Sequence, residues 1–236
     1  MKRLAVIPAR GGSKRIPNKN IKDFCGKPII AHSIGEAEAS NLFDTIHVST
    51  DSDKIAEIAA GCGHKPDFLR PQSLSDDYCP MLETVKFVVF EYAKIGLVFD
   101  TVALLYATSP LIDREDLKSA CSLFEQSNKK KPLLSVSAFP APIEHAFHLT
   151  EEGKLVPFKK EALSKRTQDL KQAYYDAGMF AFYSPEYIKN SIQAGDFMDY
   201  MGFEVASYKV TDIDWPEDWK RAEALYKAAS TMKKQK

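Results

Sequence analysis

The sequence has no excess of charge of either sign. Its 236 residues include 32 lysines and arginines and 32 aspartates and glutamates, so the formal net charge is zero. Proteins that bind nucleic acid or anionic membrane surfaces through phosphate groups normally carry a basic excess. The balance therefore argues against a protein dedicated to nucleic acid or to a membrane, and it predicts that recognition of any polyanion is local.

The sequence also has few cysteines and no long hydrophobic run. Its four cysteines are scattered and form no C-x-x-C pair, and a chain of this length folds stably without crosslinks. Six uncharged residues separate Arg3 from Arg10, which is too few for the core of a signal peptide, and no run is long enough to span a bilayer. We expect a soluble cytoplasmic protein with reduced thiols.

The order of apolar runs and helical segments predicts the fold class. Apolar runs rich in β-branched residues occur at 4–7, 45–49, 101–106, 133–137, 178–183 and 203–208. Segments of helical period occur at 27–39, 51–60, 81–95 and 215–229, and a further helix begins at Asp113. This alternation is typical of helices that cover a mostly parallel sheet. We predict one α/β domain over residues 1–236, with 101–106 as a central strand.

The interval 139–175 departs from this pattern. It has no clear period, and it contains three prolines and a basic cluster at 159–166. Its aromatic and apolar side chains are more than a lone loop can easily bury. We predict that this interval leaves the core as an extension.

The loop after the first predicted strand has an unusual composition. The stretch IPARGGSKRIPNKN, residues 7–20, holds two adjacent glycines, four basic residues and no acidic residue. A turn at the carboxyl edge of an open α/β sheet lies where ligands of such folds bind. Gly11 and Gly12 allow close approach of backbone N–H groups to phosphate oxygens, and the basic side chains offset the charge of a triphosphate.

This loop matches neither of the common phosphate-binding fingerprints. It lacks the G-x-x-x-x-G-K-[ST] spacing and the G-x-G-x-x-G spacing, so the kinase-type and dinucleotide-binding hypotheses lose support. A glycine turn with solvated lysines is the alternative to a phosphate site. Four basic residues without an acid favour the phosphate site.

Two aspartates near the carboxyl end form a candidate metal pair. Asp212 and Asp214 flank Ile213, and in an extended segment this spacing places both carboxylates on one face. Mg²⁺ takes one or two carboxylates together with substrate phosphates and water, so the pair needs no further protein ligand. The alternative is an acidic surface pair, or a cap of the helix that begins near Trp215.

These motifs together resemble one protein family. The run IPARGGSK with Lys19-Asn20, and the motifs Ser49–Asp51, Phe68–Asp77, Thr108–Pro110 and Asp212–Asp214, are similar to those of the sugar-acid cytidylyltransferases, which make CMP-sialic acids. They follow the family's order over nearly the whole chain. The residues within these motifs are most similar to those of the pseudaminic acid branch of the family. Tyr106-Ala107 stands where sialic acid enzymes typically have Gln-Pro, which argues against plain N-acetylneuraminate as the substrate.

The resemblance implies a fold, a reaction and a site. The fold is a three-layer Rossmann-like nucleotide-sugar transferase fold. The reaction is CMP transfer from CTP to the anomeric hydroxyl of a nonulosonic acid, with Mg²⁺ as cofactor, held by Asp212 and Asp214. The implied catalytic residues are Arg10, Lys19, Asp212 and Asp214. The implied CTP-binding residues are Pro8, Ala9, Arg10, Gly11, Gly12, Ser13, Lys14, Asn20 and Arg70. The implied sugar-binding residues are Thr108, Ser109, Arg166, Gln168 and Asp176.

Several of these residues have plainer alternatives. Arg70 can form a surface ion pair with the aspartates at 76–77, and Thr108 and Ser109 can cap the following helix. The basic cluster at 159–166 can be a solvated face. No residue in the sequence stands out as a general base.

The assembly and the reaction also have alternatives. Family members are usually homodimers in which an extension such as 139–175 reaches over the partner's site, so we predict a homodimer; the alternative is an extension that folds back on its own core. Legionaminic, N-acetylneuraminic or deoxy-octulosonic acid can replace pseudaminic acid as acceptor. A CTP-binding regulator without turnover is the alternative from another class.

Overall fold

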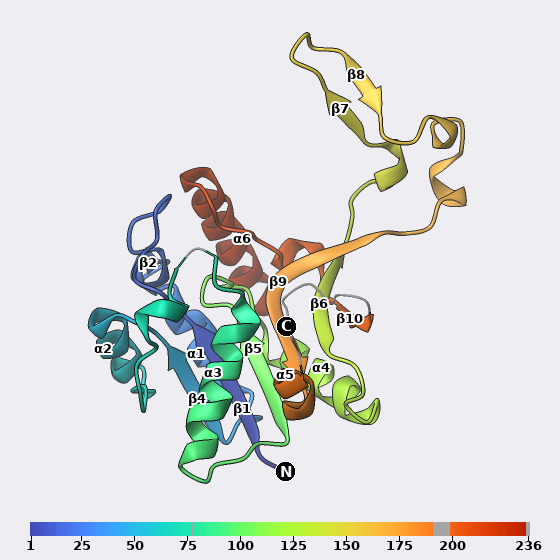
Figure 1. The fold of residues 1–236 in the computed structure, drawn as a ribbon. Helices are drawn as coiled ribbons and strands as arrows, with labels where there is room; N and C mark the ends of the chain where they lie inside the picture. Colours follow the sequence, from blue (N-terminus) through green and yellow to red (C-terminus); the bar gives the residue numbers. More distant parts are fainter. Residues whose placement is uncertain (77, 191–198, 235–236) are drawn as a thin grey trace.

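The computed structural model describes residues 1–76, 78–190 and 199–234, and a six-stranded sheet forms its centre (Figure 1). The strand order is β10-β6-β9-β5-β1-β4, and β9 alone runs antiparallel to its neighbours. The strands are β1 (Arg3–Pro8), β4 (Thr45–Ser49), β5 (Thr101–Leu105), β6 (Leu133–Ala138), β9 (Tyr174–Tyr183) and β10 (Met201–Glu204). The predicted mostly parallel α/β sheet is confirmed.

Helices cover both faces of this sheet. They are α1 (Ile30–Ala39), α2 (Asp53–Gly61), α3 (Met81–Lys94), α4 (Arg114–Gln126), α5 (Pro185–Asn190) and α6 (Pro216–Lys234). Asp113 caps α4, because its side chain accepts a hydrogen bond from the Glu115 N–H at 2.9 Å. Across the described ranges, none of these helices combines the length and the apolar character that crossing a membrane requires.

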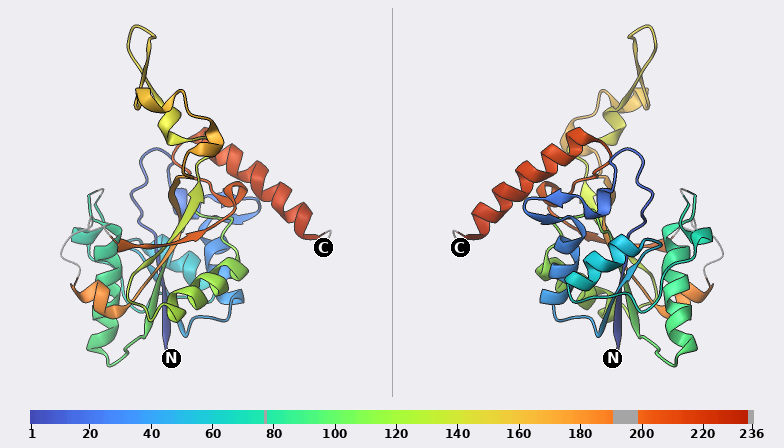
Figure 2. Two further views of the ribbon diagram at one scale, coloured as in Figure 1. Left: turned by 90° about the vertical axis from the view of Figure 1, so that its right-hand side faces the viewer. Right: turned by 90° about the vertical axis from the view of Figure 1, so that its left-hand side faces the viewer.

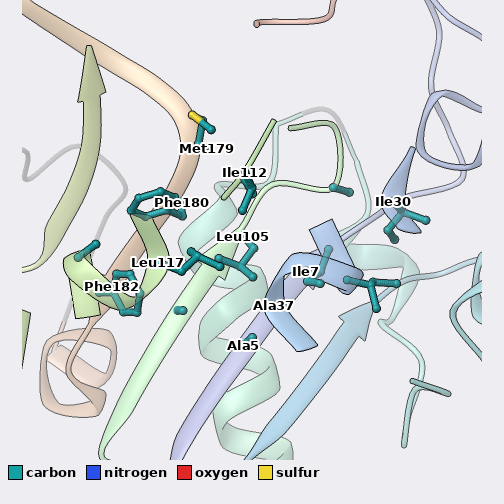
Figure 3. Packing of buried hydrophobic residues seen from close by; sticks show 14 of the residues in the cluster. Ala5, Ile7, Ile30, Ala37, Leu105, Ile112, Leu117, Met179, Phe180 and Phe182 are labelled. Carbon is teal, nitrogen blue, oxygen red and sulfur yellow. The ribbon is translucent and has the colours of Figure 1, made fainter. Parts of the chain in front are cut away.

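Alternate residues of β1 face the two sides of the sheet. Ala5 and Ile7 pack in a cluster with α1, α2 and α4, and Figure 3 shows both beside Leu105 of β5. Leu4 and Val6 pack on the opposite side with α3 and α5. A strand buried on both faces is expected to read as a continuous apolar run, which β1 does. The predicted three layers are therefore confirmed.

The predicted helix over 27–39 begins later than its periodicity suggests. Lys27–Pro28 forms the short strand β3, which pairs antiparallel with β2 (Asp23–Phe24). Cys25 and Gly26 form the turn between them with φ values of 52° and 95°, which suit a tight two-residue hairpin turn. The hairpin occupies the start of the predicted helix, so α1 begins at Ile30.

Residues 139–173 form an arm that leaves the sheet between β6 and β9 (Figures 1 and 2). At its far end β7 (Phe147–Leu149) pairs antiparallel with β8 (Leu155–Pro157). Three short 3-10 turns complete it, at Ile143–His145, Lys160–Ala162 and Thr167–Asp169. Strand β9 begins at Tyr174, four residues before the predicted start, because its first residues pair with the end of β6 at the base of the arm.

His47 of β4 lies buried in an aromatic cluster. Tyr92 donates its hydroxyl hydrogen to Asp67 Oδ2 at 2.6 Å, and His47 Nδ1 lies 3.1 Å from the same hydroxyl oxygen. The neutral ring therefore donates from Nδ1, and Nε2 makes no hydrogen bond with the described residues. Burial disfavours the imidazolium and lowers the pKa of His47 to about 4.

We expect this histidine to make the protein less stable in mild acid. The unfolded chain binds a proton at this ring near pH 6.5, whereas the folded chain binds it only near pH 4. Stability is therefore lost as pH falls through this window, by about 2 kcal/mol between pH 7.5 and pH 5.0. Denaturant unfolding at both pH values measures the loss, and His47→Gln should reduce it because an amide does not titrate.

His148→Gln is the matched control, because His148 is an exposed residue of the arm. It should keep the pH dependence of the wild type. Equal pH dependence in wild type and His47→Gln would contradict the role of His47.

Candidate active site

A cavity of about 560 Å³ lies at the carboxyl edge of β1 and β5. Its walls come from segments that are far apart in the sequence: the opening loop after β1, Arg70, the start of α3, the residues after β5, and the segment before α6. The carboxyl ends of neighbouring parallel strands meet at one edge of a sheet, and this brings the loops together.

The opening loop is held by hydrogen bonds to its own backbone and to the loop after β4. The Gly11 N–H donates to Asp51 Oδ1 at 3.0 Å, and Asn20 Nδ2 donates to the Arg10 carbonyl at 2.9 Å. A Cβ on Gly11 would lie 3.2 Å from the Ser52 Cβ, so any side chain there would push the two loops apart by a few tenths of an ångström. Asp51 thus supports the loop, a role that its motif alone did not indicate.

The structure brings most of the predicted CTP-binding residues to one cavity. Its walls include Pro8, Arg10, Ser13, Lys14, Asn20 and Arg70. Gly11 and Gly12 belong to the same loop without lining the cavity, and Ala9 is buried in the core cluster behind it. Arg15 and Lys19 also line it, so all four basic side chains of the opening loop share this cavity wall.

Arg70 is buried in this cavity wall rather than at the surface. It is 6% exposed, and its Nε and Nη1 donate to Ser75 Oγ and Thr84 Oγ1, both at 3.2 Å. No carboxylate within the described ranges forms an ion pair with it, and Asp77, one predicted partner, lies outside those ranges. Desolvation lowers the pKa of Arg70. A buried cation with neutral partners suits a ligand that brings hydrogen-bond acceptors.

Asp212 and Asp214 both line the cavity, and the residue between them points away from it. Ile213 is 1% exposed and packs with Ile16 and Trp219. Asp214 accepts from Arg15 Nη1 at 2.6 Å and from Lys19 Nζ at 3.4 Å. Asp212 has no hydrogen bond or ion pair with any described residue. The predicted alternation of the two carboxylates around Ile213 thus holds, although the segment is not a strand.

A second cavity of about 750 Å³ adjoins the first. Tyr106, Thr108 and Asp212 line both. Three of the predicted sugar-binding residues lie in the walls of the second, namely Thr108, Ser109 and Asp176. The two cavities therefore meet at Asp212.

Local contacts define these walls. Ser109 donates its hydroxyl to the Gly178 carbonyl at 2.8 Å, and Asp176 Oδ1 accepts from the Gly178 N–H at 2.8 Å. The cap of α4 is Asp113, so the alternative in which Thr108 and Ser109 cap that helix is wrong. Burial raises the pKa of Asp176, and the nearby charge of Asp212 raises it further.

The other two predicted sugar-binding residues lie elsewhere. Arg166 and Gln168 belong to the arm, and neither lines a cavity of the same chain's sheet edge. Arg166 is 72% exposed and donates from Nε and Nη2 to the carboxylate of Asp169 at 2.9 and 3.1 Å. Within one chain these two residues are not brought to the site.

Comparison with known proteins identifies the family to which this chain belongs. A sequence model described as "Cytidylyltransferase" matches residues 4–236. The chain belongs to the cytidylyltransferase family. The resemblance found in the motifs is therefore confirmed.

Relatives of this cytidylyltransferase match it over nearly its full length. It is 40% identical over 228 residues to the pseudaminic acid cytidylyltransferase of Campylobacter jejuni strain 81-176, covering 96% of this chain and 97% of that protein. It is 33% identical over 231 residues to the CMP-N,N'-diacetyllegionaminic acid synthase of Legionella pneumophila, covering 95% and 96%.

A solved structure shares the fold. The CMP:2-keto-3-deoxy-manno-octonic acid synthetase, solved in complex with CTP, superposes with a TM-score of 0.72 at 19% identity. The match covers 97% of this chain and 100% of the other. The fold of this cytidylyltransferase is thus one that occurs in enzymes of very different sequence.

The carboxylates of Asp212 and Asp214 fit a magnesium ion whose other ligands are phosphate oxygens of a nucleotide and water. No three His, Cys, Asp or Glu side chains within the described ranges lie close enough together to hold a metal. Two carboxylates are nevertheless sufficient for Mg²⁺ when phosphate oxygens and water complete its shell. Asp212 and Asp214 supply oxygen ligands of the type that this ion requires.

Tyr106 is a site residue that the motifs did not identify. Its N–H donates to the Met179 carbonyl and its carbonyl accepts from Ser33 Oγ, which fixes the backbone between the cavities. Burial, and the charges of Asp176 and Asp212, raise the pKa of its phenol to about 12. The phenol stays neutral at physiological pH and keeps its hydrogen. The sequence marked this position only as a departure from Gln-Pro, and the folded structure shows that Tyr106 lines both cavities.

The buried position of Arg70 makes its predicted role in CTP binding testable. Arg70→Gln should weaken CTP binding by about tenfold or more, since a hydrogen bond from a buried cation is lost. Isothermal titration with CTP measures this. Arg114→Gln is the control, because Arg114 lies outside this cavity in an exposed ion pair with Glu36. Unchanged CTP affinity in Arg70→Gln would contradict the prediction.

Proposed function

We propose that this protein transfers CMP from CTP to the anomeric hydroxyl of pseudaminic acid and releases pyrophosphate. The observation that carries the proposal is the pair of cavities that meet at Asp212, one lined by a basic loop and the other by hydroxyl and carboxylate groups. Two reactants can meet at such a junction. The likeness to a pseudaminic acid cytidylyltransferase supports the choice of acceptor.

In this proposal the first cavity holds CTP. Arg10, Lys14 and Lys19 offset the charge of the triphosphate and of the departing pyrophosphate, and they are in place before the reaction begins. Arg70 lines the same cavity and binds the cytosine or ribose. Asp51 accepts the hydrogen bond of the Gly11 N–H and so holds the backbone of the loop, while the basic side chains of the loop meet the phosphates.

The second cavity holds the sugar acid. Thr108 and Asp176 supply a hydroxyl and a carboxylate for the hydroxyl and acetamido groups of the sugar. The neutral phenol of Tyr106 adds a donor where the two substrates meet. These groups orient the anomeric hydroxyl toward the α-phosphorus, and orientation of this kind is a large part of catalysis in phosphoryl and nucleotidyl transfer.

The reaction is a substitution at the α-phosphorus of CTP. The anomeric hydroxyl loses its proton to water as its oxygen forms a bond to phosphorus, the bond from phosphorus to the bridging oxygen breaks, and pyrophosphate leaves. Mg²⁺, held by Asp212 and Asp214 together with the phosphates, would lower the pKa of the hydroxyl and neutralise the phosphate charge. The basic residues of the opening loop stabilise the departing pyrophosphate. We place the reaction in the cytoplasm, where CTP is available.

Pyrophosphate release tests the proposed reaction and its acceptor together. We expect release from CTP and Mg²⁺ with pseudaminic acid, and much slower release with N-acetylneuraminic acid at the same concentration. Legionaminic and deoxy-octulosonic acid serve as further comparisons. Release with another acid alone would replace the acceptor and keep the reaction. CTP binding without release in any of these mixtures would favour the regulator.

We also propose a homodimer in which the arm of each chain reaches the second cavity of the other. Exposed apolar side chains on β7 and β8 support it: Phe147, Leu149, Leu155 and Val156 are 43–71% exposed. An apolar hairpin of this kind marks a contact surface. The arm also carries Arg166, whose guanidinium suits the carboxylate of the sugar acid and which lies apart from its own chain's cavity.

Mixing two inactive variants tests whether the arm acts across the dimer. Arg166→Ala and Asp212→Asn should each lose activity, the first because it weakens sugar binding and the second because it removes a metal ligand. After unfolding and refolding together, the mixture should regain about one quarter of wild-type activity, since half of the dimers are mixed and each has one intact site. No regain in refolded dimers would contradict the shared site.

A further inference from the structure

The carboxylate of Asp214, one of the two proposed metal ligands, already contacts two basic side chains of the protein. Arg15 Nη1 lies 2.6 Å from Asp214 Oδ2, and Lys19 Nζ lies 3.4 Å from Asp214 Oδ1. Both oxygens of this carboxylate are therefore engaged. The neighbouring carboxylate, Asp212, has no such partner among the described residues.

Arg15 and Lys19 hold this segment in different ways. Lys19 is 22% exposed and also donates to the Ile213 carbonyl at 2.6 Å, so it supports the backbone. Arg15 is 51% exposed, and its guanidinium carbon lies over the ring of Trp215, 5.4 Å from the ring centroid. An ion pair exposed to this degree contributes little net stability. The contact of Arg15 with Asp214 can therefore exchange, while that of Lys19 is built into the segment.

A triphosphate in the first cavity would compete for Arg15. Arg15 lines that cavity together with Arg10 and Lys14. A guanidinium binds phosphate oxygens with two hydrogen bonds, and a triphosphate carries more charge than one carboxylate. Arg15 thus has two anionic partners to choose between, Asp214 and the triphosphate, and only Asp214 is present before the nucleotide binds.

We propose that Arg15 is a positioning residue that holds Asp214 in place of the metal until CTP binds. The phosphates draw Arg15 away from Asp214, and this carboxylate then accepts the divalent cation that arrives with the nucleotide. No three metal-binding side chains lie together in the described ranges, so phosphate oxygens and water would complete the shell of an ion held by this pair when CTP is bound. The proposal rests on the proposed function only in taking CTP as the ligand of the first cavity.

The consequence is that metal binding depends on nucleotide. Without CTP, Asp214 is neutralised by two cations and the segment has little attraction for a third. With CTP, one of these cations is transferred to the phosphates and the carboxylate becomes available. The site without CTP is therefore expected to bind divalent metal only weakly.

Binding of Mn²⁺ to the nucleotide-free protein tests this directly. We expect electron paramagnetic resonance titration to find weak binding in the wild type and about tenfold tighter binding in Arg15→Gln. Lys14→Gln is the matched control, because it removes the same charge from the same loop without a bond to Asp214. The double variant Arg15→Gln with Asp214→Asn should lose the gain.

Two results would overturn the proposal. One is an Arg15→Gln protein that binds Mn²⁺ no more tightly than Lys14→Gln, and the other is a wild type that binds Mn²⁺ equally well with and without CTP. The titration needs no sugar acid and no turnover. A failure of pyrophosphate release would therefore count against the proposed function alone.

Discussion

The burial of Ile213 beneath the opening loop joins the two ends of the chain. Its side chain packs with Ile16, Phe24 and Trp219 in a cluster apart from the sheet, and burial of an isoleucine contributes about 1.5–3 kcal/mol. Because its neighbours in an extended segment point the other way, the same packing presents Asp212 and Asp214 to the first cavity. The position of the proposed metal site depends on this apolar contact.

The parts of the fold that local sequence controls could be predicted. The apolar run of β1 and the glycine pair after it have their own signatures, so the strand and the ligand-facing loop were identifiable without tertiary information. The hairpin of β2 and β3 was not, since strands of two residues show no period. The antiparallel direction of β9 could not be predicted either, because the long arm before it allows either orientation in the sheet.

Residues of the candidate site divide in the same way. Motifs identified the side chains that lie in the walls of the first cavity, such as Arg10 and Arg70. They could not identify contacts between distant segments, such as Arg15 with Asp214, or the position of Tyr106 at the junction of the two cavities. Such contacts depend on how β1, β5 and α6 are packed, and a single sequence carries no local signal for them.

The continuity of β9 has a mechanical consequence. This one strand runs from Tyr174 at the base of the arm, past Asp176 in the second cavity, to Tyr183, which pairs with Val102 inside the sheet. Its inner end pairs with both β5 and β6 and is therefore fixed on both sides. Its first residues pair with β6 as well, Asp176 with Val136, so the sheet itself fixes the wall of the second cavity next to the base of the arm.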